Sequence, residues 1–282
     1  MIRQIIEIII KNLTHRKLRA YLTILGIIIG VTALISLMTL GQGLEDGITK
    51  QFDKFGIRRI FIASKTTGSF GPPSGIGTIT REDIKTLEKL PFLEFVQSMY
   101  RDSAEIDFNH KKEIMDVFGL DTENVRQFLE EAGREPEEGR YLEKGDSKVA
   151  MIGYLLAKEY FDKEIPLKGS IDIDGVKFRV IGILKEEGSR ENDMVIQIPI
   201  DDLRELKNKP DAITAITAQV VKGYDIDEAA TKIERALKKE RNDENFIVTN
   251  PKKIKEQAGM ILGAVRWVVS AIAAISLLVG GI

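Results

Sequence analysis

The sequence predicts a membrane protein in which helical transmembrane segments flank a mixed α+β extracytoplasmic domain with a largely antiparallel sheet. Three observations lead to this fold class. An uncharged apolar run covers residues 20–44, and a second apolar run continues to the last residue, Ile282. Between the two runs lie about 210 residues that are rich in charge, enough for a hydrophobic core of their own.

Residues 1–19 are predicted to form a cytoplasmic amphipathic helix with a basic flank. Isoleucines recur at helical spacing on one side of this segment, and polar residues lie mostly on the other. Such a helix suits the surface of a membrane, and packing on a partner's soluble domain fits the same pattern. The basic flank, which we place at the membrane interface, contains Arg16, Lys17 and Arg19.

The run over residues 20–44 is predicted to be the first transmembrane helix. About 20 apolar residues in helical form cross a hydrocarbon core of about 30 Å, and this run is long enough. It exceeds the apolar region of a cleavable signal peptide, roughly 7 to 15 residues, so we expect it to remain as an anchor. Gly26, Gly30 and Ala33 form a face of small residues for helix packing, within this subunit or against another.

The distribution of charge predicts which side of the membrane the chain occupies. Basic residues precede the first span, and Glu45 and Asp46 follow it directly. Since positive charge favours the cytoplasmic side, we expect the N-terminus in the cytoplasm and the large domain outside the cell membrane. Lysines and arginines also occur beyond the span, but long domains are translocated largely regardless of charge.

Residues 45–255 are predicted to form the extracytoplasmic domain. Thr80 and Asp83 have the spacing of a helix capping box, and Asp174-Gly175 between two alternating runs is a strong hairpin signal. The predicted elements are a strand over 57–64, a loop over 64–78, a helix over 80–90, strands over 104–108 and 114–120, a helix over 122–132, a strand and helix within 139–161, a hairpin over 170–184, a strand over 194–198, a short helix from 201, a strand over 213–221 and a helix over 226–239.

Residues 256–282 are predicted to be a stalk and a truncated second transmembrane helix, reached by a helix that starts near Lys252. From Trp267 to the end the chain forms about 24 Å of helix, less than a bilayer core of about 30 Å. We therefore expect the sequence to stop inside this second span. Arg266 and Trp267 are placed at the outer interface, where the arginine can extend to water. The alternative is an arginine that lines a substrate path.

The sequence lacks the motifs of several other protein classes. It has no cysteine, no Gly-x-x-x-x-Gly-Lys-Ser/Thr phosphate loop and no Gly-x-Ser-x-Gly motif, and its two histidines, His15 and His110, have no companions at metal-ligand spacing. The net charge of −2 comes from intermixed acidic and basic residues, so nucleic acid is not an expected partner. We assign no catalytic, cofactor-binding or metal-binding residue and do not expect an enzyme.

Three segments resemble the MacB-like and FtsX-like permeases of ABC transporters. Residues 17–44, KLRAYLTILGIIIGVTALISLMTLGQGL, resemble the first transmembrane segment of this family, with a basic residue, LT-x-LG and a closing G-x-G. Residues 139–153, GRYLEKGDSKVAMIG, and the hairpin IDIDGVKFRVIGIL are similar to the core of the family's extracytoplasmic domain. The terminal AAISLLVGGI resembles the start of the FtsX-type membrane region.

This resemblance implies a permease subunit with four membrane helices that forms a homodimer or heterodimer. It implies an ABC ATPase on a separate polypeptide, which binds ATP and Mg²⁺, and an accessory protein outside the membrane. In such permeases ATP hydrolysis moves the outer domain to export or extract a substrate such as an antibiotic, peptide, lipid or lipoprotein.

Two other functions remain open at this point. One is an FtsX-like transmembrane regulator that does not transport but controls an extracytoplasmic partner. The other is a two-span sensory receptor whose outer domain binds a small ligand.

Overall fold

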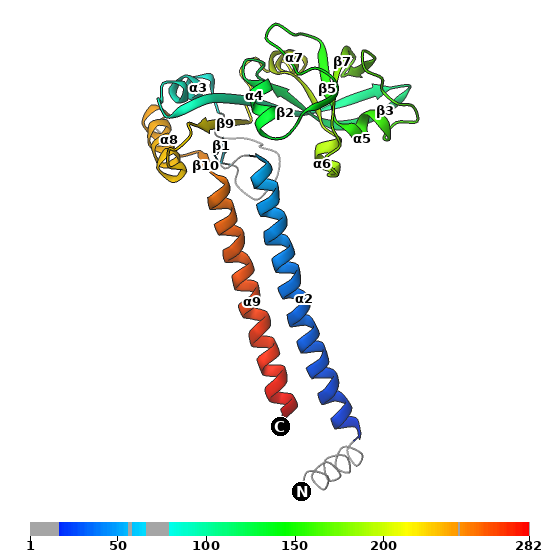
Figure 1. Ribbon diagram of the computed structural model, residues 1–282, viewed down its shortest axis with the longest axis vertical. Helices are drawn as coiled ribbons and strands as arrows, with labels where there is room; N and C mark the ends of the chain where they lie inside the picture. Colours follow the sequence, from blue (N-terminus) through cyan, green and yellow to red (C-terminus); the bar gives the residue numbers. More distant parts are fainter. Residues whose placement is uncertain (1–16, 56–57, 66–78, 242, 282) are drawn as a thin grey trace. The chain divides into compact units, whose positions relative to one another are not determined.

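The computed structural model describes residues 17–55, 58–65, 79–241 and 243–281. The chain divides into two compact units (Figure 1). One comprises the two long helices, within Met1–Gln51 and Lys252–Ile282, and the other is a sheet domain, Phe52–Pro251. Two predicted segments lie outside the described residues: most of the amphipathic helix over 1–19 and most of the loop over 64–78.

The first long helix, α2 (Lys17–Phe55), contains a segment suited to cross a membrane. Its 20 residues Ile24–Gly43 have a mean hydropathy of 2.3. Among the described residues, α2 is the one helix whose length and apolar composition are sufficient to cross a membrane. The predicted span over 20–44 includes it. No proline interrupts the polar residues that follow the span, and α2 continues to Phe55. Residue 45, where the extracytoplasmic domain is predicted to start, therefore lies within this helix.

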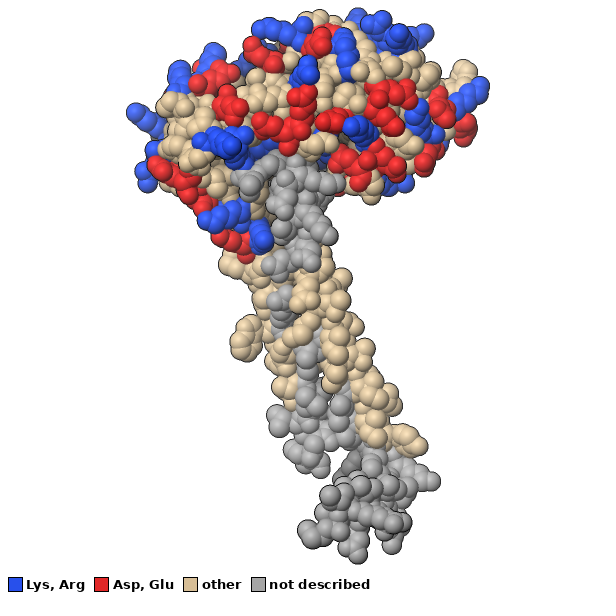
Figure 2. Space-filling view, viewed as in Figure 1, with Lys and Arg blue, Asp and Glu red and all other residues tan. Residues whose placement is uncertain are grey.

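The second long helix, α9 (Pro251–Gly281), begins where the sequence predicts a helix. Trp267 and Ile272 have exposed fractions of 80% and 57%, so apolar side chains lie open on its surface. Figure 2 shows tan surface along the described parts of the long helices and intermixed acidic and basic side chains on the visible face of the domain. The second transmembrane span stays a prediction.

The domain is built on one ten-stranded mixed sheet with the order β10-β1-β9-β2-β3-β8-β5-β7-β4, and β6 pairs with β2 and β7. Two pairings, β3–β8 and β5–β7, are parallel, and the others described are antiparallel. The strands are β1 Arg59–Ser64, β2 Leu93–Phe108, β3 Lys111–Leu120, β4 Pro136–Gly139, β5 Val149–Ile152, β6 Ser170–Ile173, β7 Val176–Leu184, β8 Ile196–Pro199, β9 Ala215–Val220 and β10 Phe246–Thr249.

Two lobes share this sheet. The first lobe consists of β1, β9, β10, α3 and α8 around one apolar cluster, and the second consists of β3 to β8 with α4 to α7 around two further clusters. The helices of the domain are α3 Arg81–Glu88, α4 Val125–Glu131, α5 Tyr154–Lys158, α6 Arg190–Asp193, α7 Ile200–Leu206 and α8 Ile226–Arg241.

The long strand β2 joins the lobes. Its first half pairs with β9 of the first lobe, and its second half pairs with β3 and β6 of the second. The chain crosses back through the connection between α7 and β9, residues 207–214. Each lobe therefore keeps its own core while two backbone segments connect them.

Several local predictions are confirmed. Asp174 and Gly175 both have positive φ, and Ile173 pairs with Val176, so the two residues form the predicted tight hairpin turn. The capping box is present as well, with Thr80 N donating to Asp83 Oδ2 at 2.7 Å.

Three elements, β4, β10 and α6, were not predicted, and β2 is much longer than the predicted strand over 104–108. Gln97 and Ser98 of β2 are buried polar residues, so they interrupt the apolar pattern on which a strand prediction rests. The other elements have only four residues each, too few to show a period.

We expect Gly139→Ala to destabilise the domain strongly. Gly139 has a φ of 87°, and an added Cβ would lie 2.1 Å from the carbonyl oxygen of Ile181 in the neighbouring strand. Gly145→Ala is the matched control, because its φ is 89° and the space around it is open. The control should cost about 1 to 3 kcal/mol of unfolding free energy from backbone strain alone. If urea denaturation gave the same loss of unfolding free energy for both variants, the close contact with Ile181 would have no influence on stability.

Candidate functional site

The two long helices are connected to neighbouring strands of the sheet. β1 follows α2 along the chain, β10 precedes α9, and the two strands pair antiparallel from Phe61↔Thr249 to Ser64↔Phe246 (Figure 1). A further backbone hydrogen bond, from Lys65 N to Asn245 O at 2.9 Å, extends this pairing. We call the β1–β10 pair the joint.

The joint is held to the first lobe by apolar burial. Ile60 and Ile62 of β1 have exposed fractions of 0% and 1% and pack with Ala218 of β9 and Ile233 of α8. β1 also hydrogen-bonds to β9 on the side opposite β10. Because β1 is paired on both sides, its backbone has little freedom to move separately from the first lobe.

The other face of β1 carries a buried guanidinium group. The Arg59 residue is 0% exposed; its Nε donates to Gln219 Oε1 at 3.3 Å, and its Nη2 donates to the carbonyl oxygen of Phe128 at 2.6 Å. The guanidinium carbon lies 4.6 Å from the centre of the Phe128 ring. Burial lowers the pKa of Arg59, and the Glu131 carboxylate acts in the opposite direction. One side chain of β1 thus contacts α4 of the second lobe.

The preceding residue, Arg58, makes polar contacts nearer the surface. Its Nη1 donates to Val220 O at 2.6 Å and lies 3.0 Å from Oε2 of Glu94. The other carboxylate oxygen of Glu94, Oε1, accepts a hydrogen bond from Gln127 of α4 at 2.8 Å. These ion-paired side chains are more than a third exposed, so solvent weakens their attraction.

The start of α9 is fixed by a buried amide. Asn250 is 0% exposed and directly precedes Pro251, the first residue of the helix. Its Nδ2 donates to Asp227 Oδ1 in the first turn of α8 at 3.0 Å. Proline is well suited to the first position of a helix, where the backbone N–H has no helical partner. The domain residue that directly precedes α9 is thus bonded to α8 of the first lobe.

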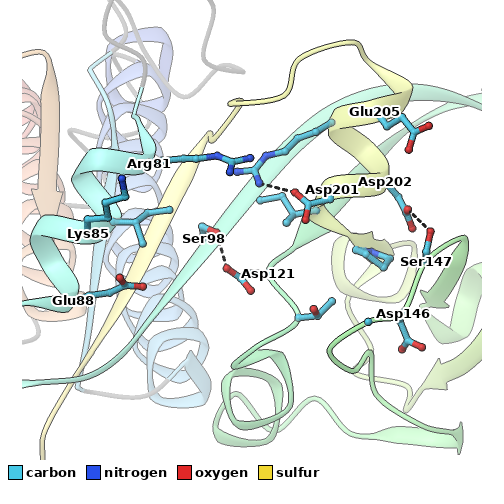
Figure 3. A pocket seen from close by; sticks show the side chains of 16 residues that line it. Arg81, Lys85, Glu88, Ser98, Asp121, Asp146, Ser147, Asp201, Asp202 and Glu205 are labelled. Atoms are coloured by element: carbon cyan, nitrogen blue, oxygen red, sulfur yellow. Dashed lines mark hydrogen bonds and ion pairs between the residues drawn. The ribbon is translucent and has the colours of Figure 1, made fainter.

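A cleft of about 600 Å³ lies between α3 of the first lobe and α7 of the second (Figure 3). Clefts are common at the boundary between two structural units. It is lined by Arg81, Ile84, Lys85, Glu88, Ser98, Asp121, Thr122, Gly145, Asp146, Ser147, Pro199, Ile200, Asp201, Asp202, Arg204 and Glu205.

Many of the cleft's charged groups are used to hold its own walls. Asp202 accepts hydrogen bonds from Ser147 Oγ at 2.8 Å and from Lys148 N at 2.7 Å, which fixes the loop before β5 against α7. Asp146 accepts two hydrogen bonds from Arg140, at 2.7 and 2.8 Å. Within the segment GRYLEKGDSKVAMIG, the arginine and the aspartate therefore bond to each other and fix the loop.

Two arginines hold the second crossover between the lobes. Arg81 of α3 donates to Pro210 O at 3.0 Å, and Arg204 of α7 donates to Ala212 O at 3.1 Å. Both lobes therefore bind the connection over 207–214. Among the described residues, no group of three or more His, Cys, Asp or Glu side chains could hold a metal ion. The connection is thus bonded to a helix of each lobe.

The site residues predicted from sequence lie in the long helices. Gly26, Gly30 and Ala33 are all in α2, and the space around Gly26 is open, with no atom within 4 Å of an added Cβ. The helix-packing role of this face stays a prediction, as does the interface role of the flanking residues. Of these, Lys17 and Arg19 lie in the first turn of α2, Arg266 and Trp267 lie in α9, and Arg16 lies outside the described residues.

Sequence reasoning missed Arg58, Arg59 and Asn250. The available signals were weak: two arginines within a predicted strand, and an Asn-Pro pair ahead of a helix. Neither signal shows that a side chain is buried or what it contacts.

Comparison with known proteins gives consistent matches over most of the chain. The family model described as the MacB-like periplasmic core domain matches residues 20–236. An uncharacterized ABC transporter permease of Methanocaldococcus jannaschii is 34% identical over 279 residues, 99% of this chain and 69% of that protein. The macrolide export ATP-binding/permease protein MacB of Bartonella henselae is 24% identical over 274 residues, and the match covers 94% of this chain but 41% of that protein.

A solved structure agrees with these matches. The periplasmic region of MacB from Actinobacillus actinomycetemcomitans superposes with a TM-score of 0.63 at 19% identity, over 75% of this chain and 97% of that one. At this identity the likeness shows the fold alone. It confirms the mixed α+β architecture of the domain, whereas the family model and the Methanocaldococcus relative confirm the resemblance inferred from sequence.

We expect Asp146→Asn to weaken the acid dependence of the domain's stability. The hydrogen bond from Arg140 is the main cause that lowers the pKa of Asp146. A carboxyl group whose pKa is lowered by folding stabilises the native state above its unfolded pKa of about 3.9, and this contribution is lost as the pH falls through the folded pKa. The variant should lose about 1 kcal/mol of unfolding free energy at neutral pH, a small loss because Arg140 is partly exposed to solvent. The difference from the unmodified chain should shrink as the pH falls.

Urea denaturation at pH 7, 5, 4 and 3 measures this effect. Asp162→Asn, at an exposed aspartate, serves as the control and should follow the unmodified chain at every pH. An Asp146→Asn curve parallel to that of the unmodified chain would contradict the assignment.

Proposed function

The chain belongs to the MacB-like family of ABC transporter permeases, and we propose that it is the permease subunit of an exporter with a separate ATPase subunit. In this proposal ATP hydrolysis on the partner moves α2 and α9, and the extracytoplasmic domain follows. The substrate is an antibiotic, peptide, lipid or lipoprotein that is exported or extracted from the membrane.

The joint is the observation that carries this proposal. A machine that works by transmitting movement needs rigid connections between the membrane and the outer domain. α2 leads into β1, and β10 leads into α9, so both helices act on the same pair of hydrogen-bonded strands. A displacement of either helix is delivered to the first lobe, because β1 is also paired with β9 and buried in its core.

We place ATP and Mg²⁺ on a partner subunit. The sequence contains no Gly-x-x-x-x-Gly-Lys-Ser/Thr motif. The Methanocaldococcus relative, with the higher identity, is named a permease, whereas the Bartonella relative is named an ATP-binding/permease protein. This difference supports an ATPase that acts in trans and a chain that is not itself an enzyme.

We propose that α2 and α9 both span the cell membrane, with the N-terminus in the cytoplasm and the domain outside. Two such permeases form a dimer, in which the small-residue face of Gly26, Gly30 and Ala33 lets membrane helices approach closely. Arg266 and Trp267 lie at the outer interface in this arrangement. An accessory protein outside the membrane completes the proposed assembly.

Export is favoured over regulation of a partner and over a sensory role. The Bartonella relative is named for macrolide export, and the match extends across the domain that handles the outer steps in this proposal.

Reconstitution tests the proposal. The full-length protein is purified from its host with any bound P-loop ATPase, and the pair is placed in lipid nanodiscs. We expect ATP hydrolysis to rise several-fold when the permease is present, and Gly30→Leu to reduce this stimulation because it separates the packed helices. Ile28→Leu is the volume-matched control on the exposed surface of α2. Failure of any P-loop ATPase to bind, or an unchanged hydrolysis rate, would overturn the proposal.

A further inference from the structure

We infer that Arg59 is a positioning residue that couples the joint to the second lobe through α4. The source of the movement rests on the proposed function, but the contact is a property of the domain itself. Arg59 is the first residue of β1, close along the chain to the end of α2. Any displacement that reaches β1 therefore reaches this side chain.

Two routes lead from β1 to the second lobe. One runs through the sheet, from β1 to β9, then to β2, and on to β3. The other is direct, because the Arg59 guanidinium donates to the carbonyl oxygen of Phe128 at 2.6 Å and stacks on its ring at 4.6 Å. The direct contact bypasses β9 and the whole length of β2.

α4 moves with the second lobe because its apolar face is buried there. Val125 and Leu129 have exposed fractions of 0%, and they pack with Leu142 of the loop before β5 and with residues of β5 and β7 such as Met151. A force applied to the backbone of α4 is therefore carried into the core of that lobe. Glu131, at the end of the same helix, lies 4.0 Å from Arg59 Nη2.

Stability alone does not account for this arrangement. Moving a charged group out of water is costly, and apolar residues of similar volume often replace buried ion pairs without loss of stability. Arg59 also keeps one nitrogen, Nη1, buried without a hydrogen-bond partner among the described residues. Such a group is expensive to retain, whereas its planar shape and fixed donors set the position of α4 relative to β1.

Two of the other polar contacts that involve the lobes or their connection lie nearer to water. The Arg58–Glu131 pair is separated by 3.9 Å with side chains 34% and 28% exposed, and the Arg81–Asp211 pair has side chains 53% and 78% exposed. Exposed pairs are worth little and are screened by salt. The buried contact of Arg59 is therefore the better candidate for a fixed coupling.

A distance measurement across the lobes tests the inference. The chain has no cysteine, so spin labels attach only at introduced positions. Glu240→Cys on α8 and Lys144→Cys in the second lobe are both exposed and carry the labels. The full chain is placed in lipid nanodiscs, and double electron–electron resonance spectroscopy records the distribution of distances between the two spin labels.

We expect Arg59→Met to broaden this distribution at least twofold in a domain that still unfolds in one cooperative transition. Arg126→Met is the matched control, because Arg126 is an exposed arginine of α4 that pairs with Glu130, and it should leave the distribution unchanged. Arg59→Lys keeps the charge but loses the planar stack, so we expect intermediate broadening.

A folded Arg59→Met variant with a distribution as narrow as that of the unmodified chain would overturn the inference. If Arg59→Met does not fold, Arg59→Lys decides the same question: broadening supports the coupling and a narrow distribution overturns it. The measurement contains no ATPase, so its failure leaves the proposed permease function untouched. Failure of ATPase stimulation, conversely, leaves the contact between β1 and α4 untouched.

Discussion

Backbone hydrogen bonding between β1 and β10 is the constraint on which the rest of the structure depends. These strands are distant in sequence, yet their pairing brings together the residues that follow α2 and those that precede α9. Had each helix led into a different lobe, a movement in the membrane would pull the lobes independently. In the proposed mechanism the first lobe receives a single input, because both helices lead into one paired element, and the second lobe responds through β2, residues 207–214 and α4.

The positions of the buried polar side chains are consistent with two lobes that each have an apolar core. Apolar clusters hold each lobe together internally, whereas polar side chains such as Arg59, Gln97 and Asn250 are buried where segments that are separated in sequence meet. Polar contacts have strict geometry, so they fix relative positions more narrowly than apolar packing does. The cleft between α3 and α7 has the same character, since its acidic groups mostly fix loops and helix ends.

Much of the fold follows from local signals. The long apolar run, the capping box at Thr80 and Asp83, and the Asp174-Gly175 turn each depend on neighbours in sequence, so their structures could be predicted. β10 could not, because four residues show no period and its pairing with β1 is a long-range event. The same holds for the candidate site. The role of Arg59 depends on Phe128, which lies far along the chain, and a single sequence without known contacts gives no sign that the two meet.

Disulfide trapping of the joint tests the central claim most directly. Ala63 and Ile247 are register partners in β1 and β10, and opposite residues of an antiparallel pair have Cα atoms about 4.5 to 5.5 Å apart, within the range for a disulfide. In membranes containing the full chain, mild oxidation of Ala63→Cys with Ile247→Cys should give a disulfide in nearly all molecules. Ala63→Cys with Val248→Cys, shifted by one residue to the opposite face, should give almost none. Equal yields from the two variants, or no disulfide in the first, would contradict the account.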